Sequence, residues 1–221
     1  DVCSSDLSER AASALMEGGQ GPWAWHIDAF DRTTVDLRVP WFVPVTLGPG
    51  TAPTRQVRNS ASRSLGGAVG ASWVSTQGYA GVALDTYRND YGVTVEPDVT
   101  IRMKRERLSA AAQWRQLPGL WSQVDVQASR TRYRHLEVEG TGEVGTTFNS
   151  EGSDLRLQAQ HAPWGAWRGV MGLQAEDLQF SALGEEAFVP STRTRSSALF
   201  LVESWRVDSW PDLELSAGMR A

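Results

Sequence analysis

Apolar and polar residues alternate along most of this chain, a pattern typical of β-strands that keep one face against an apolar medium. The alternation is clearest near the C-terminus, where Leu213, Leu215 and Met219 share one parity and polar or small residues lie between them. Similar segments recur between clusters of glycine, proline and polar residues. We predict nine strands and the end of a tenth, over residues 23–32, 68–76, 79–88, 99–115, 121–135, 150–161, 166–180, 196–207 and 212–221, preceded by Arg10–Met16.

Two of these segments have an irregular pattern. Within 99–115 the apolar parity changes between Met103 and Leu108, which favours a β-bulge near residues 105–107. A helix over 107–115 is the alternative, because alanines favour helix, but the position of the segment between two strands and before a Leu-Pro-Gly stop favours a strand. The end of the eighth segment, 198–207, is apolar on both parities, so its faces stay unassigned.

The connections between the strands alternate in length. Short turns fall at 77–78, 116–119, 162–165 and 208–211, and the longer connections lie at roughly 33–64, 89–98, 136–149 and 181–194. A soluble β-sandwich has no reason to collect its long loops on one side, whereas outer-membrane barrels have short periplasmic turns and long extracellular loops. The alternation therefore favours a membrane barrel.

Most of the ten tryptophans lie within a few residues of the short turns: Trp23, Trp114, Trp121, Trp164, Trp167, Trp205 and Trp210. Tryptophan prefers the interface of a membrane, because its ring is apolar and its indole N–H reaches water or headgroups. We interpret these residues as one aromatic girdle. The alternative is a set of hydrophobic side chains that closes one end of a soluble barrel.

Composition narrows the protein class further. The chain of 221 residues is 41% hydrophobic and 21% charged, which is too apolar for a disordered segment, and prolines interrupt its longest uncharged stretch, 39–54. A spanning helix of about 20 apolar residues is therefore excluded. The formal charge is −5, and arginine is interleaved with acidic residues along the chain, so no broad basic patch for nucleic acid is expected.

The two ends of the chain carry their own expectations. The single Cys3 forms no internal disulfide, and residues 1–7 resemble a translated sequencing adapter, so we expect a non-native scar there, with an ordinary polar N-terminus as the alternative. No initiator methionine is present, and the last strand stops at Ala221 in mid-pattern. We therefore expect residues 8–221 to be a fragment of a larger barrel.

These patterns predict an all-β fold: a partial, antiparallel, up-and-down transmembrane β-barrel of about nine strands. In lipid every backbone N–H and C=O group must be paired internally, which only a closed barrel achieves with strands. The apolar parity then faces lipid, and the polar parity faces a hydrated or occupied lumen. A soluble barrel with its apolar parity inside produces the same alternation, and loop asymmetry and the tryptophan girdle favour the membrane form.

Several motifs are similar to the barrel of TonB-dependent outer-membrane receptors, over residues 9–221. They are Gly21-Pro22-Trp23-Ala24-Trp25-His26, Asn89-Asp90-Tyr91-Gly92-Val93, Glu143-Val144-Gly145-Thr146-Thr147-Phe148, Trp167-Arg168-Gly169 and Gly184-Glu185-Glu186-Ala187-Phe188-Val189-Pro190 before Thr194-Arg195-Ser196. The first two of these motifs are similar in particular to the zinc-uptake and iron-complex receptor branch. The resemblance implies a bacterial outer-membrane location, a plug domain within 22 strands and energy from the TonB complex. Residues 8–221 depart from the family pattern, because we expect the plug domain, the TonB box and the remaining strands to be absent from them.

Candidate metal ligands lie where a strand meets a long loop. His135, Glu137 and Glu139 share one parity, and an imidazole with carboxylates suits a divalent metal. If the resemblance to zinc receptors holds, this set is the first candidate for metal capture at the cell surface. The alternative is a solvated extension of the strand. His26 and His161 are expected to have structural roles.

No residues support an enzyme. Glu185 and Glu186 are adjacent in an outer loop, where they do not face each other as a catalytic dyad must, and Phe188 is interpreted as a packing or substrate-contacting residue. Nucleophile elbows, P-loops and dinucleotide-binding fingerprints are absent.

We therefore expect a barrel segment that takes part in uptake of a metal ion or metal chelate, such as zinc or an iron chelate, with no intrinsic cofactor. Expected partners are outer-membrane lipid, the plug domain, the TonB complex through that plug and the small substrate, and no nucleic acid. The alternatives are a plug-less outer-membrane barrel that acts as adhesin or enzyme, and a soluble lipid-binding barrel.

Overall fold

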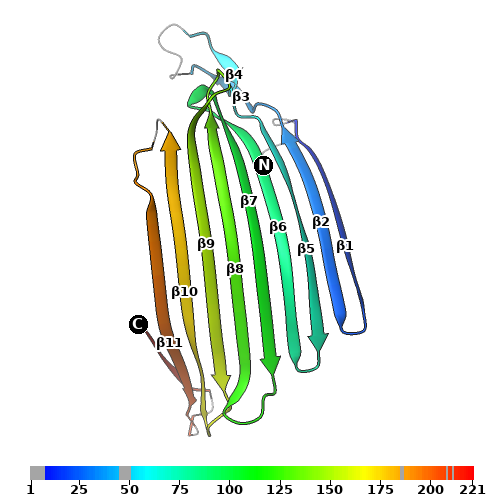
Figure 1. Cartoon of the computed structure of the whole chain (residues 1–221), viewed down its shortest axis with the longest axis vertical. Helices are drawn as coiled ribbons and strands as arrows, with labels where there is room; N and C mark the ends of the chain where they lie inside the picture. The colour runs from blue at the N-terminus through cyan, green and yellow to red at the C-terminus, as the bar shows by residue number, and fades with distance from the viewer. Residues whose placement is uncertain (1–7, 45–50, 185–186, 208, 211) are drawn as a thin grey trace.

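The computed structural model describes residues 8–44, 51–184, 187–207, 209–210 and 212–221. They form one ten-stranded antiparallel sheet in which each strand pairs with the strands that precede and follow it, in the order β1-β2-β5-β6-β7-β8-β9-β10-β11-β12 (Figure 1). Its strands are β1 (Arg10–Gln20), β2 (Trp23–Thr34), β5 (Ser62–Ser75), β6 (Gly78–Val93), β7 (Glu96–Arg115), β8 (Trp121–Val138), β9 (Val144–His161), β10 (Trp167–Gly184), β11 (Thr192–Arg206) and β12 (Glu214–Arg220).

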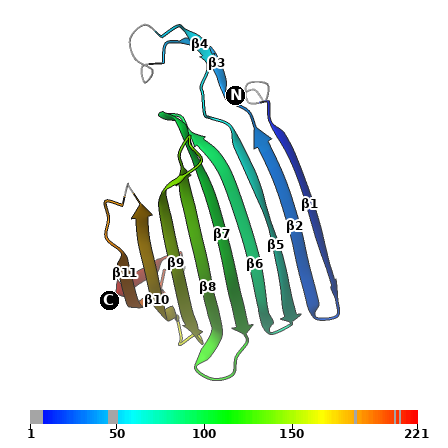
Figure 2. The same cartoon turned by 45° about the horizontal axis from the view of Figure 1, so that its top comes forward.

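A small second sheet extends one end of the molecule. β3 (Arg38–Phe42) and β4 (Thr54–Gln56) pair antiparallel within the connection between β2 and β5, beyond the ends of the large sheet (Figures 1 and 2). Among the described residues no helix is long and apolar enough to cross a membrane.

The predicted strands are confirmed, and so is the choice of strand over helix for 107–115. The bulge predicted near residues 105–107 is wrong, because β7 keeps an unbroken register from Thr100 to Trp114 with both of its neighbours. The apolar parity slips because the environment changes along one regular strand. Leu108 and Trp114 lie on the face that carries the apolar residues of the neighbouring strands, whereas Ile101 and Met103 lie on the other face.

Two of the predicted long loops are instead strand. β6 and β7 are separated only by residues 94–95, and β8 and β9 only by 139–143. Both hairpins continue past the 9–11 residues that a tilted strand needs to cross a bilayer. On these extensions polar residues also occupy the face that is apolar elsewhere, so the alternation of apolar and polar residues stops. A segment without that alternation is predicted as a loop.

The register gathers the apolar residues of successive strands into one continuous surface, which we name the apolar face. One cross-strand row of it contains Trp23, Trp73, Ala80, Ala112, Val126, Leu157, Leu173 and Leu199. The tryptophans of this face lie at its short-turn end, and Trp167 stacks on Trp205 across β10 and β11 with ring centroids 6.0 Å apart. The register also assigns the two faces of β11, because it places Leu199 and Leu201 on the apolar face.

The sheet has almost no hydrophobic core. Among the described residues the buried hydrophobic side chains are Ile101, Val138 and Ala182, whereas Trp23 is 60% exposed and Leu199 67%. A soluble sandwich or barrel buries such residues, at a gain of about 1.5–3 kcal/mol for each large side chain. The apolar face is thus an extended hydrophobic surface that the described residues leave uncovered.

Candidate functional site

The opposite face of the sheet, which we name the polar face, is lined by charged and amide side chains. Its cross-strand neighbours include Asp85 with Arg107, Gln127 with Arg156, and Glu176 with Ser196. An ion pair of 2.7 Å joins Arg105 and Asp85. In a barrel whose apolar face meets lipid, this face lines a hydrated or occupied lumen, so the polar face is the candidate transport surface.

Asp125 is the centre of one hydrogen-bonded cluster on the polar face. The side-chain amides of Gln113, Gln123 and Gln158 donate to its carboxylate oxygens at 2.7, 2.8 and 3.5 Å. Three strands thus contribute to a single carboxylate, which is held in place by neutral donors. The three amides fix the orientation of this carboxylate on the polar face.

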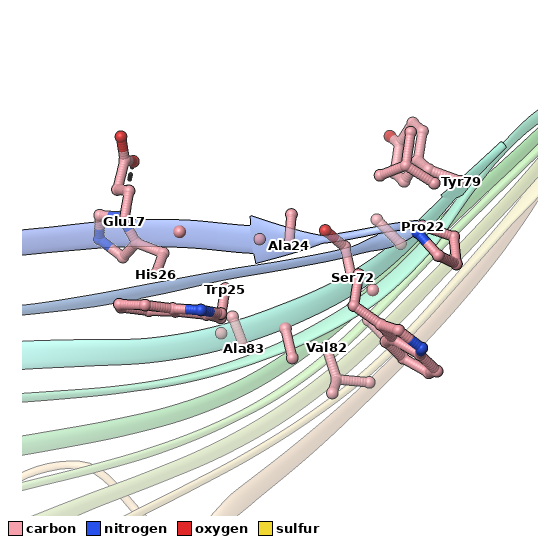
Figure 3. Close-up of a pocket in the computed structure, with 18 of the residues that line it drawn as sticks. Glu17, Pro22, Ala24, Trp25, His26, Ser72, Tyr79, Val82 and Ala83 are labelled. Carbon is pink, nitrogen blue, oxygen red and sulfur yellow. Dashed lines mark hydrogen bonds and ion pairs between the residues drawn. The ribbon is translucent and has the colours of Figure 1, made fainter. Parts of the chain in front are cut away.

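A second cluster lies beside the hairpin between β1 and β2, in a hollow of about 960 Å³ (Figure 3). His26 contacts Glu17 through Nδ1 at 2.9 Å and Asp28 through Nε2 at 2.7 Å. Each carboxylate is an acceptor, so both ring nitrogens act as donors and neither offers a lone pair to a metal. This geometry fits the structural role expected for His26.

His135 lies on the polar face near the end of β8. The Tyr133 hydroxyl lies 2.9 Å from Nδ1 of His135, and the Phe148 ring lies 4.4 Å from the imidazole between centroids. Glu137 shares the face. Glu139 follows the last residue of β8, in a turn where its N–H donates to the carbonyl of Glu143 at 2.9 Å.

These contacts give no preformed metal centre. Over the ranges that the structure describes, no group of three or more His, Cys, Asp or Glu side chains is arranged to hold a metal ion. Metal capture by His135, Glu137 and Glu139 therefore stays a prediction. Glu185 and Glu186 lie outside the described residues, as do residues 1–7. Phe188 is 85% exposed, so it does not pack within its loop.

His161 joins segments that are far apart in the sequence. Its Nδ1 lies 2.6 Å from the carbonyl of Ala162, and its Nε2 lies 3.2 Å from the Glu203 carboxylate of β11. The sequence predicts a structural role for His161, whereas its acidic partner cannot be inferred from a local pattern because 42 residues separate the two. Both lie on the apolar face at the tryptophan end, where they line a hollow of about 570 Å³.

The connections at the other end of the sheet are tied together by side-chain amides and carboxylates. Asn59 donates to the carbonyls of Val93, Glu96 and Val99 at 3.1, 3.0 and 2.6 Å. Asp36 accepts from the backbone N–H groups of residues 60 and 61. Nearby, a hydrogen bond from Arg32 lowers the pKa of Glu9. The rim above the polar face is thus ordered by specific contacts.

Comparisons with known proteins place the fold. No family model matches the sequence, whereas 33 chains of solved structures match the structure. One is the copper transporter OprC, with a TM-score of 0.70 over 97% of this chain and 14% sequence identity. This chain spans 37% of the length of that transporter.

At that identity the likeness shows the fold: an all-β, up-and-down antiparallel sheet of the outer-membrane barrel type. The predicted fold class is confirmed. Within the described residues β1 and β12 do not pair, so the sheet is open.

Proposed function

We propose that this chain is part of the wall of an outer-membrane barrel that takes up a metal ion or a metal chelate. The observation that carries the proposal is the continuous apolar face of a single-layered sheet whose other face is polar. A sheet of this kind is stable only where lipid covers one side and water or protein fills the other.

The similar fold of a copper transporter supports metal as the substrate class. The polar face supports it as well, because Asp125, Asp85 and Glu176 supply carboxylates along the lumen. Oxygen ligands and imidazole suit weak, exchangeable contacts with divalent cations or with the polar groups of a chelate. Zinc and iron chelates are the substrates that the sequence resemblance favours.

Transport in this proposal requires a plug within the barrel and energy from the TonB complex. The wall itself supplies the lumen and the extracellular rim, where His135, Glu137 and Glu139 act in first contact with the metal. The open edges at β1 and β12 are the surfaces on which further strands pair to close the barrel.

Uptake is tested in cells that lack the gene, by measuring cellular copper, zinc and iron with mass spectrometry under limitation of each metal. We expect the content of one metal to fall, to recover on complementation, and to fall equally when TonB is deleted. Unchanged metal contents would contradict uptake but leave the membrane wall standing. A metal content that falls when the gene is deleted but not when TonB is deleted would contradict only the proposed energy source.

A further inference from the structure

The apolar face changes character toward the end of the sheet that carries β3 and β4. There it presents a cluster of cations, which we name the basic belt: Arg88, Lys104, Arg130, Arg132 and Arg134. Three of them form one cross-strand row, in which Arg88 lies opposite Lys104 and Lys104 lies opposite Arg134. Like charges directly opposite each other on neighbouring strands repel, so this row is unfavourable without an anion.

The protein neutralises only part of the belt. Lys104 contacts Glu106 at 2.6 Å, and Arg130 and Arg132 share Glu151 at 3.2 and 3.8 Å. Five cations thus face two carboxylates. In the next row Arg102 lies opposite Asp90, so those two charges offset each other.

Arg88 and Arg134 lie outside the ion pairs of the belt, and Arg88 is close enough to Glu106 to interact with its charge. Within the described ranges neither forms an ion pair, and both side chains are exposed. Arginine presents a planar fork of donors that matches a phosphate group, and a lysine between two arginines adds a compact positive charge. The row therefore has the chemistry of a phosphate site.

The height of the row on the wall decides what carries the phosphate. Ten residues separate Lys104 from Trp114 at the short-turn end, or about 33 Å at about 3.3 Å per residue. A strand tilt of about 40° reduces this to about 25 Å, which is the height of the apolar band in such barrels. The row therefore lies where the opposite membrane surface, with its headgroups, meets the wall.

We propose that the row of Arg88, Lys104 and Arg134 in the basic belt binds the phosphate groups of a phosphorylated lipid in the outer leaflet. Leu108 and Leu84 lie opposite each other on the same face, four residues from Lys104 and Arg88 toward the short-turn end, where they cover the acyl chains of that lipid. The inference rests on the proposed function, because it requires the apolar face to be in a bilayer. Nucleic acid lacks the apolar part that this continuous surface accommodates.

The test uses the full chain in detergent micelles, titrated with a diphosphorylated glycolipid and with the same glycolipid after removal of its phosphates. Native mass spectrometry reports the bound lipid. We expect at least about tenfold tighter binding of the phosphorylated form, and a weaker preference at high salt. The variant Arg88→Gln/Lys104→Gln/Arg134→Gln is expected to lose the preference.

A matched control removes three cations from the polar face: Arg107→Gln/Arg156→Gln/Arg168→Gln. The control is expected to keep the preference for phosphate. Equal preference in the belt variant and the wild type would overturn the proposal, and so would loss of the preference in both variants. If the belt variant does not fold, Arg88→Gln and Arg134→Gln carry the test singly, since neither breaks an ion pair.

Two further measurements distinguish failure of the proposed phosphate site from failure of the proposed membrane wall. Quenching of tryptophan fluorescence by brominated phosphatidylcholine in neutral vesicles measures insertion without any anionic lipid. Insertion without a phosphate preference would overturn the belt alone, whereas failure to insert would overturn the membrane wall. A duplex DNA fragment that displaces the phosphorylated lipid at equal concentration would show a general polyanion surface and overturn the lipid assignment.

Discussion

At the scale of single residues, the turns depend on glycines that no other residue replaces equally well. Gly78 begins β6 with a φ of 150°, and a β-carbon there would overlap the carbonyl oxygen of Gln113 on β7. Gly21, in the turn between β1 and β2, has a φ of 59° and open space around it. Gly78 is thus constrained both by its backbone conformation and by the neighbouring strand, whereas Gly21 is constrained by its backbone conformation alone.

Gly78→Ala is therefore expected to destabilise the protein more than Gly21→Ala. The left-handed conformation alone costs about 1–2 kcal/mol for a residue with a β-carbon. The overlap at Gly78 adds displacement of a neighbouring strand to that cost. Urea unfolding of both variants in the same lipid vesicles measures the difference. A larger loss for Gly21→Ala would mean that the contact between Gly78 and Gln113 is not tight.

At the scale of the strands, what matters is which face each residue occupies. Leu155 of β9 is 41% exposed on the apolar face, opposite Ala128 and Ala175. Gln127 of β8 lies on the polar face beside Arg156. The two positions are close together along the sheet, yet in the proposed barrel one meets acyl chains and the other meets the lumen.

Leu155→Arg is expected to lower the free energy of unfolding in a bilayer by about 2–4 kcal/mol, as for a cation near the midplane of the lipid face. Gln127→Arg is the matched control, for which we expect a loss below about 1 kcal/mol from repulsion with Arg156. Unfolding titrations in vesicles compare the two. A greater loss for Gln127→Arg would show that the polar face, not the apolar face, excludes water.

At the scale of the whole molecule, the sheet is one layer with a continuous apolar surface and few buried side chains. Exposed apolar patches larger than a few hundred Å² are rare on soluble monomers. In the proposed barrel, lipid and not a protein core surrounds the apolar side chains, and pairing between strands supplies the backbone hydrogen bonds.

The chain is accordingly expected to be monodisperse in detergent and to associate when detergent is removed. Analytical ultracentrifugation at a fixed protein concentration, with and without detergent above its critical micelle concentration, measures this. A stable monomer in plain buffer would contradict the membrane wall and support the soluble lipid-binding barrel.

The sequence alone determined the strands, their direction and the composition of their faces, because alternation along a strand is a local property of the chain. It also placed the tryptophans at the short-turn end. Toward the far ends of the long hairpins the pattern stops being regular, so it predicts long loops at 89–98 and 136–149 where β6, β7, β8 and β9 continue.

Only the tertiary structure decided which residues meet across the strands, because register depends on pairs that are distant in the sequence. Arginines are interleaved with acidic residues along the chain, so the sequence predicts no basic patch. Pairing of the strands nevertheless brings Arg88, Lys104 and Arg134 into one row. The amides around Asp125 and the contact between His161 and Glu203 arise in the same way. The position of a residue along its strand decides which face it occupies. The register between separate strands decides which charged residues lie next to it.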